Sequence, residues 1–208
     1  MAYTEGLAIF IFVLALWIWS RMRALIRPSQ GARIEPRPGT AILLVNLQEA
    51  FWNDARYTGD QRARVEAAVL REVTLAQHND QPVIALRQEY SDLGFRLVAR
   101  LLHGGKAVRG GPGLGLAAPF VGMADHMVVK QVQDGFESGE LDTVLRALRI
   151  GRLRFLGLAG EHDVAKTAQG ALNRGYEVEL VSDGIATARD GAFDPVAEAL
   201  GGQGARVV

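Results

Sequence analysis

The sequence predicts an α/β protein: a three-layer α/β/α sandwich with a mainly parallel sheet, preceded by a single transmembrane helix. Short apolar runs, typical of buried strands, alternate along the chain with segments of helical periodicity. That alternation favours a parallel sheet covered by helices on both faces. The chain has 208 residues, of which 49% are hydrophobic, and this is enough for one sizeable domain. The apolar residues are also concentrated in one uncharged stretch at the N-terminus.

That N-terminal stretch predicts a membrane anchor. Glu5 is the only charged side chain before Arg21, so the apolar stretch is just long enough to cross a hydrocarbon core of about 30 Å. Trp17 and Trp19 follow at its end, where indole rings favour the headgroup region. A cleaved signal peptide is the alternative, but it needs positive charge before the apolar run and small residues after it, and neither is present. We therefore expect residues 6–26 to contact the inner (cytoplasmic) membrane as a single pass, with the domain on the cytoplasmic side.

The rest of the chain divides by composition. We expect an anchor helix at 1–27, a proline- and glycine-rich linker at 28–39, a domain at 40–200 and a flexible, glycine-rich tail at 201–208. Strands are expected at Thr40–Asn46, Pro82–Leu86, His126–Lys130, Phe155–Ala159 and Tyr176–Val181. Helices are expected at Asp60–Gln77, Leu93–Leu102, Leu141–Ile150, Val164–Asn173 and Pro195–Leu200.

Composition excludes several function classes. The 23 basic and 23 acidic residues balance, so bulk charge gives no indication of nucleic-acid binding. The absence of cysteine excludes disulfides, thiolate metal sites and cysteine nucleophiles. The glycines of Gly104–Pro119 lack the strand–GxGxxG–helix context of a dinucleotide site and indicate an irregular loop. No cofactor is therefore expected.

Polar residues stand where three of the predicted strands end. Asn46 closes the first strand, Lys130 closes the third, and Asp163 lies at the turn between the fourth strand and its helix. In open α/β sheets, ligands bind beyond the carboxyl ends of the strands, at the point where the strand order reverses. These three side chains are the candidate site.

The order and spacing of five segments resemble the isochorismatase-like hydrolase family, which includes nicotinamidases and related cysteine hydrolases. The resemblance covers residues 40–187 and rests on Ala41–Phe51, Val128–Lys130 followed by Phe136, Leu156–Asp163, Ala171–Val178 and Val181–Ala186. It implies the sandwich fold, a pocket at the carboxyl edge of the sheet, and frequent homo-oligomers.

The resemblance also assigns roles to the three strand-end positions. Family cysteine hydrolases use an aspartate after the first strand to take the thiol proton, a lysine after the third, and a cysteine nucleophile at the turn. These positions align with Asn46, Lys130 and Asp163, so only the lysine is retained. An asparagine amide cannot accept a proton near neutral pH, and the cysteine-free isochorismatases need the aspartate as well.

A buried lysine needs a counter-charge, because an unpaired buried ammonium destabilises a fold. Here Asp163 can supply that charge from the position of the missing thiol. We expect a Lys130–Asp163 ion pair, with Asn46 hydrogen-bonded alongside.

Other interpretations of the neighbouring residues stay open. Asp163 can itself act as a nucleophile or general base, and Glu161 can substitute for it. His162 lies between the two acids, but adjacent side chains on a turn point apart, and the Asp-x-His spacing of metal-binding nicotinamidases is absent, so no metal is expected. Three aromatic residues either line the pocket or belong to the core: Phe51, Trp52 and Phe136.

Three functions follow. The first is a membrane-anchored, catalytically degenerate family member that serves as an interaction or structural subunit, as a homo-oligomer or with other membrane-protein subunits. The second is an active hydrolase of an amide or vinyl ether that uses Lys130 and Asp163. The third is a module that binds a small molecule in the inherited pocket. A pocket filled by side chains favours the first function, and an open one favours the others.

Overall fold

A computed structural model describes residues 2–102 and 104–208 and contains a single parallel sheet. The strand order is β3-β2-β1-β4-β5-β6, and every neighbouring pair is parallel. The strands are β1 Gly39–Val45, β2 Val83–Gln88, β3 His126–Lys130, β4 Ile150–Gly157, β5 Glu177–Ile185 and β6 Arg206–Val207. The predicted α/β class and parallel sheet are confirmed.

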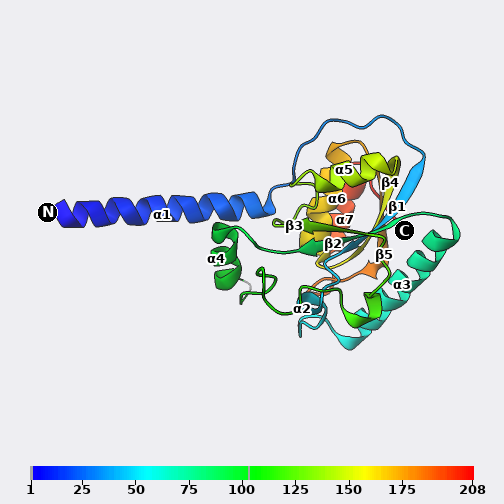
Figure 1. Ribbon diagram of the computed structural model, residues 1–208, viewed down its shortest axis with the longest axis horizontal. Helices are drawn as coiled ribbons and strands as arrows, with labels where there is room; N and C mark the ends of the chain where they lie inside the picture. Colours follow the sequence, from blue (N-terminus) through cyan, green and yellow to red (C-terminus); the bar gives the residue numbers. More distant parts are fainter. Residues whose placement is uncertain (1, 103) are drawn as a thin grey trace.

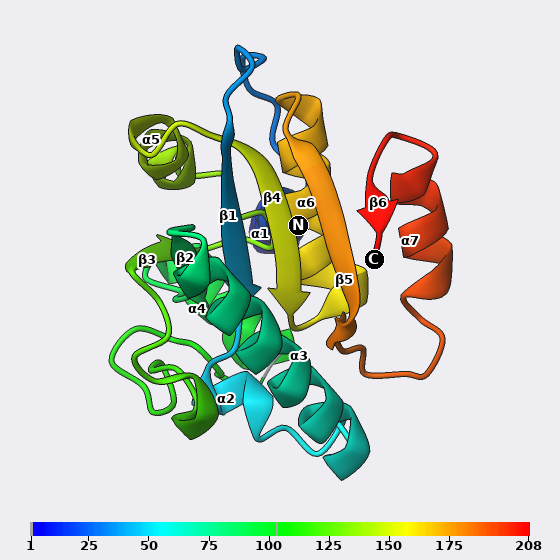
Figure 2. The ribbon, with the colours of Figure 1, turned by 90° about the vertical axis from the view of Figure 1, so that its right-hand side faces the viewer.

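Helices cover both faces of this sheet. The described residues form the helices α1 Ala2–Ile26, α2 Glu49–Trp52, α3 Gly59–His78, α4 Leu93–Leu102, α5 Glu140–Ala147, α6 Ala165–Asn173 and α7 Asp194–Gly201, with a 3₁₀ turn at Ala118–Phe120 and a π-helical turn at Gly160–Val164. In Figure 2, α3 crosses in front of the sheet and α6 lies behind it. The start of α3 is fixed by a capping box, in which the side chains of Thr58 and Gln61 each bond the other's backbone N–H.

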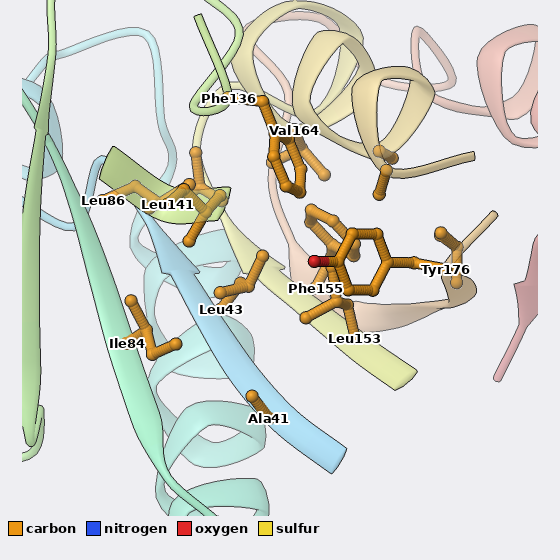
Figure 3. Close-up of a cluster of buried hydrophobic side chains, with 14 of the residues drawn as sticks. Ala41, Leu43, Ile84, Leu86, Phe136, Leu141, Leu153, Phe155, Val164 and Tyr176 are labelled. Carbon is orange, nitrogen blue, oxygen red and sulfur yellow. The ribbon is translucent and has the colours of Figure 1, made fainter. Parts of the chain in front are cut away.

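Two hydrophobic cores explain why the strands are nearly continuous apolar runs. Side chains of β1, β2 and β4 point toward α5 and α6 in one core, which Figure 3 shows. A second core lies between the sheet and α3. Leu43 belongs to the first core and its neighbour Leu44 to the second, so β1 is buried on both faces, as strands of parallel sheets are.

Several boundaries differ from expectation, and three of the differences have a clear physical reason. The tail at 201–208 is not frayed, because Arg206–Val207 pairs with β5 and so covers a strand edge that would otherwise be unpaired. Helix α5 ends at Ala147 rather than at Ile150. The left-handed residue Arg149 (φ +54°) follows and turns the chain into β4. β4 then begins at Ile150 rather than Phe155, because Arg152 and Arg154 interrupt the apolar pattern without interrupting the strand.

The helix α1 projects from one side of the body (Figure 1). By length and composition, Ile9–Ile26 is apolar enough to cross a membrane, and 6% of this window is buried. Residues 27–38 after α1 have no regular secondary structure, but they are firmly attached to the body. Ser29 donates its N–H to Asp134 Oδ2 (2.6 Å), and its carbonyl and hydroxyl oxygens accept bonds from Asn173 and Arg174 (2.9 and 3.0 Å).

We predict that Asp134→Ala loosens this attachment. Asp134 is fully buried, and burial raises the pKa of its carboxyl while hydrogen bonds from Ser29 and Phe136 oppose that rise. Removing it leaves the buried N–H of Phe136 unpaired, at a cost of about 1–3 kcal/mol, and also frees the part-buried N–H of Ser29. The denaturant midpoint should fall, and limited proteolysis within 28–39 should become faster. Glu137→Ala, an exposed carboxylate nearby, is the control, and equal behaviour of the two variants would contradict the prediction.

Candidate functional site

The three candidate residues converge at the carboxyl edge of the sheet. The strand order reverses between β1 and β4, since β2 and β3 continue from β1 on one side and β5 and β6 continue from β4 on the other. A cavity of about 70 Å³ lies at this edge and is lined by both Asn46 and Asp163. Lys130, the last residue of β3, is 1% exposed and reaches the same place from the edge strand.

The ammonium of Lys130 is fully engaged. Nζ lies 2.5 Å from Asp163 Oδ1, 2.5 Å from Gln88 Oε1 and 3.1 Å from the carbonyl oxygen of Val132. A lysine has three donor hydrogens, and each has an acceptor here. The ion pair that charge balance predicted is therefore present, with Gln88 as a further partner.

Asn46 occupies the site but not in the predicted way. It lies just after β1 with φ +51°, a left-handed conformation that asparagine tolerates better than most residues. It is 3% exposed, and its Oδ1 has no hydrogen-bond partner among the described residues. We expected Asn46 to be hydrogen-bonded beside the ion pair. The amide that bonds Lys130 there is instead that of Gln88, whose Oε1 accepts from Nζ.

The turn after β4 fixes the position of Asp163. The chain leaves β4 at Gly157, makes one π-helical turn over Gly160–Val164 and continues directly into α6. The hydroxyl of Thr167 donates to the carbonyl oxygen of Asp163 (2.8 Å) and accepts from the N–H of Gly135 (3.0 Å). These bonds hold the backbone, so the carboxylate is aimed at Lys130 while its side chain remains 15% exposed.

Gln88 was not identified as a site residue from the sequence. Its backbone is held by hydrogen bonds, as that of Asp163 is. The side chain of Gln48 accepts from the N–H of Gln88 (2.7 Å) and donates to its carbonyl oxygen (3.1 Å), so two buried glutamines are locked together. The signal was available, because Gln88 is a polar residue at the carboxyl end of β2, as Lys130 is in β3.

The aromatic candidates divide between the cavity and the cores. Phe51 lines the cavity, together with Tyr57 and Tyr90. Burial raises the pKa of both tyrosine hydroxyls above the usual range, so both are neutral at physiological pH. Trp52 packs edge-on against a core phenylalanine at 4.7 Å, and Phe136 lies beneath the guanidinium of an arginine at 4.5 Å, so these two are core residues.

The mouth of the cavity carries charge of both signs. Arg56 lines it and bonds Asp54 at 2.9 Å. With Lys106, which also bonds Asp54, it holds the pKa of that carboxyl well below its usual range. His162 lines the cavity and is exposed, whereas Glu161 Oε1 accepts from a backbone N–H at 3.3 Å and its other oxygen is unpartnered among the described residues.

Comparisons with known proteins agree with the geometry. The family model described as Isochorismatase domain matches residues 40–206. A search of curated proteins finds no significant match. The fold is shared with a pyrazinamidase/nicotinamidase from Streptococcus mutans UA159 (TM-score 0.71, 18% identity, covering 82% of this chain and 100% of that one). It is also shared with N-carbamoylsarcosine amidase from Thermoplasma acidophilum (TM-score 0.69, 23% identity, 82% and 95% covered).

A third similar structure is a pyrazinamidase of Pyrococcus horikoshii in complex with zinc (TM-score 0.69, 21% identity, 82% and 99% covered). Its metal raises the question of a zinc site here. In the part of this chain that the structure describes, no three His, Asp or Glu side chains gather as metal ligands would. The described residues therefore offer no donor set that fits zinc.

Proposed function

The chain belongs to the isochorismatase family, and we propose that it is a membrane-anchored member whose hydrolytic site no longer works as one. In this proposal it serves as an interaction or structural subunit of a membrane-associated assembly, either as a homo-oligomer or with other membrane-protein subunits. The observation that supports this most is the ion pair between Lys130 and Asp163, in which the acid occupies the position aligned with the family's nucleophile.

The side chains present are poor catalysts for the reaction that the resemblance implies. The chain contains no cysteine, and Asn46 stands at the position aligned with the proton-accepting aspartate. Of the three aligned positions only Asp163 carries a carboxylate, and its Oδ1 is bonded to an ammonium, which stabilises the negative charge and makes the group a weaker nucleophile and base. Electroneutrality of the site is maintained while the nucleophile and its base are both absent.

The size of the cavity also favours this proposal. Small-molecule sites are commonly about 300–1,000 Å³. The space at the strand ends is only about 70 Å³, and Lys130 is 1% exposed. Side chains therefore fill most of the volume that a substrate would need.

The proposed location follows from α1. A single apolar helix followed by arginines at 21, 23 and 27 fits a one-pass anchor in the inner (cytoplasmic) membrane with the domain in the cytoplasm. Such an anchor concentrates the domain at the membrane, which suits a subunit of a membrane assembly better than an enzyme of a diffusing substrate.

A second candidate function is the binding of a small polar molecule in the residual cavity. The side-chain atoms Asn46 Oδ1, Gln133 Oε1 and Gln88 Nε2 belong to residues that line the cavity, are buried, and have no partner among the described residues. Two acceptors and one donor could therefore bond a ligand of matching polarity.

An activity assay on the full-length protein in lipid nanodiscs tests the proposal. We expect no hydrolysis of nicotinamide, pyrazinamide or a vinyl ether above the level of a Lys130→Ala variant. The Asn46→Asp/Asp163→Cys double variant restores the base and the thiol. Amidase activity in this variant would show that only the chemistry was lost, whereas continued inactivity would show that the filled cavity excludes the substrate as well. Wild-type turnover that Lys130→Ala abolishes would show that the alternative, an active hydrolase using Lys130 and Asp163, is correct.

The interaction role needs a separate measurement. The protein purified from its native membranes should bring a stoichiometric membrane-protein partner or migrate as a homo-oligomer. A monomer that comes out alone would contradict this part of the proposal.

A further inference from the structure

Helix α4 exposes a row of leucines on one side. Leu93, Leu97 and Leu101 follow each other at intervals of four residues, which places them along one side of a helix, and they are 78%, 40% and 65% exposed. The same helix buries Phe95 and Val98 against the body. The helix therefore has apolar side chains on two sides, and the described residues cover only the side that carries Phe95 and Val98.

Contacts with α1 fix the position of α4 along the axis of α1. A β-carbon on Gly94 would lie 3.0 Å from the indole carbon Cζ2 of Trp17, so the two helices touch closely there. Arg21 lies 3.8 Å from Asp92, and its guanidinium is 5.4 Å from the ring centre of Phe95. The first turn of α4 therefore lies level with the segment between Trp17 and Arg21, where the proposed anchor passes from hydrocarbon to headgroups.

The orientation of α4 suits a membrane surface. In Figure 1 it lies beside the body end of α1 and runs across the direction of α1. If α1 spans the bilayer, α4 consequently lies along the bilayer surface. The arrangement is held in place, because Leu25 of α1 is buried in the same cluster as Phe95 and its carbonyl oxygen accepts from the N–H of Gln133 (2.9 Å).

The positive charges near α4 are complementary to anionic lipid headgroups. Arg96 and Arg100 lie on α4, which contains no acidic residue, and the C-terminal part of α1 and the residue after it add the arginines at 21, 23 and 27. Basic residues beside an apolar helix face are typical of helices that lie in the membrane interface. A second copy of the chain docked on this face would bring the same positive charges together, which disfavours a self-association surface.

We propose that α4 is an interfacial helix, with Leu93, Leu97 and Leu101 inserted at the boundary between headgroups and acyl chains of an anionic bilayer. The inference rests on the proposed anchoring by α1 and adds a second point of membrane contact, which fixes how the domain is oriented above the lipid. Because Tyr90 belongs to the cluster behind α4 and also lines the cavity, the side of the site nearest α4 is held close to the membrane.

Spin labelling tests this directly, since a chain without cysteine accepts a single label at any introduced cysteine. The full-length protein carrying Leu97→Cys or Leu101→Cys is reconstituted in nanodiscs of phosphatidylcholine and phosphatidylglycerol. Leu75→Cys is the matched control, because Leu75 is 51% exposed on α3, which lies on the far side of the body from α1 (Figure 1). Phe12→Cys, in the middle of α1, reports whether the anchor spans the bilayer.

Labels at 97 and 101 should collide with dissolved oxygen and lose contact with an aqueous nickel relaxant, as the label at 12 should. The label at 75 should remain accessible to nickel. If the labels at 97 and 101 are as accessible as the one at 75 while the label at 12 is in lipid, the inference is wrong and the anchoring stands. If the label at 12 is also in water, the anchoring itself fails. Spin–spin broadening at 97 that disappears on dilution with unlabelled protein would instead show that a second copy covers this face and would overturn the inference.

Discussion

Replacing Lys130 with methionine is expected to destabilise the domain by about 3–5 kcal/mol, the usual cost of removing one partner of a buried ion pair. The substitution keeps most of the side-chain volume but takes away three hydrogen bonds, to Asp163, Gln88 and the carbonyl of Val132. Asp163 is then left as a carboxylate beside a buried apolar group. Equilibrium unfolding in denaturant, followed by tryptophan fluorescence, measures the change.

The double variant Lys130→Met/Asp163→Leu is the matched control. Removing both charges together leaves no unpaired ion, and replacing a buried pair by apolar residues is often neutral or stabilising. The double variant should therefore recover most of the lost stability, which gives a large coupling energy in the double-mutant cycle. If Lys130→Met is as stable as the wild type, the pair contributes no stability and a chemical role for Lys130 becomes the better explanation.

This result would bear on function, because the two main proposals assign different roles to the same lysine. In an active hydrolase, Lys130→Met should abolish turnover whatever it does to stability. In a site kept only for its electrostatics, the substitution should alter stability alone. Measuring both quantities on one variant separates the proposals.

The sequence was enough to predict the sheet and the convergence of the site. β1 is an uninterrupted apolar run because both of its faces are buried, and such runs are recognisable without any structure. Asn46, Lys130 and Asp163 were predicted to converge because parallel strands bring their carboxyl ends to one edge. The Lys130–Asp163 pair followed from charge balance, which is also a property of the sequence once the fold is assumed.

What could not be predicted depends on contacts between distant parts of the chain. Arg154 made the first half of β4 look too polar for a buried strand. Its charge is neutralised there by Glu72 of α3 and Glu179 of β5, which are far from it in sequence. β6 has only two residues and forms because the edge of β5 is available to it. Gln88 could be placed at the same sheet edge from the sequence, but its hydrogen bond to Lys130 depends on the register in which β2 pairs with β3.

Replacing Gly157 with alanine is expected to cost more than about 4 kcal/mol, or to prevent folding, which is a large effect for one methyl group. Gly157 ends β4 opposite Val45 of β1, with φ +123°. An added β-carbon would lie 2.1 Å from the carbonyl oxygen of Val45 and 2.8 Å from its nitrogen. Both atoms belong to the backbone of a central strand, so neither can move aside without opening the sheet. The yield of folded protein and the denaturant midpoint measure the effect.

Gly175→Ala is the control for backbone conformation. Gly175 also has a positive φ, +82°, but a β-carbon there would meet nothing within 4 Å. That substitution should cost only the left-handed conformation, about 1–2 kcal/mol. The difference between the two variants therefore reports the close approach of β1 and β4 together with the extra backbone strain at φ +123°. If both variants lose the same stability, the strands can separate enough to admit a methyl group.

The close approach at Gly157 also determines what the site can be. It brings the end of β1, and with it Asn46, against the start of the turn that carries Asp163, and the N–H of Leu158 donates to the carbonyl oxygen of Val45 at 2.9 Å across the same junction. In the proposal of a degenerate site, this junction is retained as a structural requirement of the sheet. Substitutions at 46 and 163 can remove the chemistry without disturbing that junction, whereas a substitution at 157 should remove the fold and the site together.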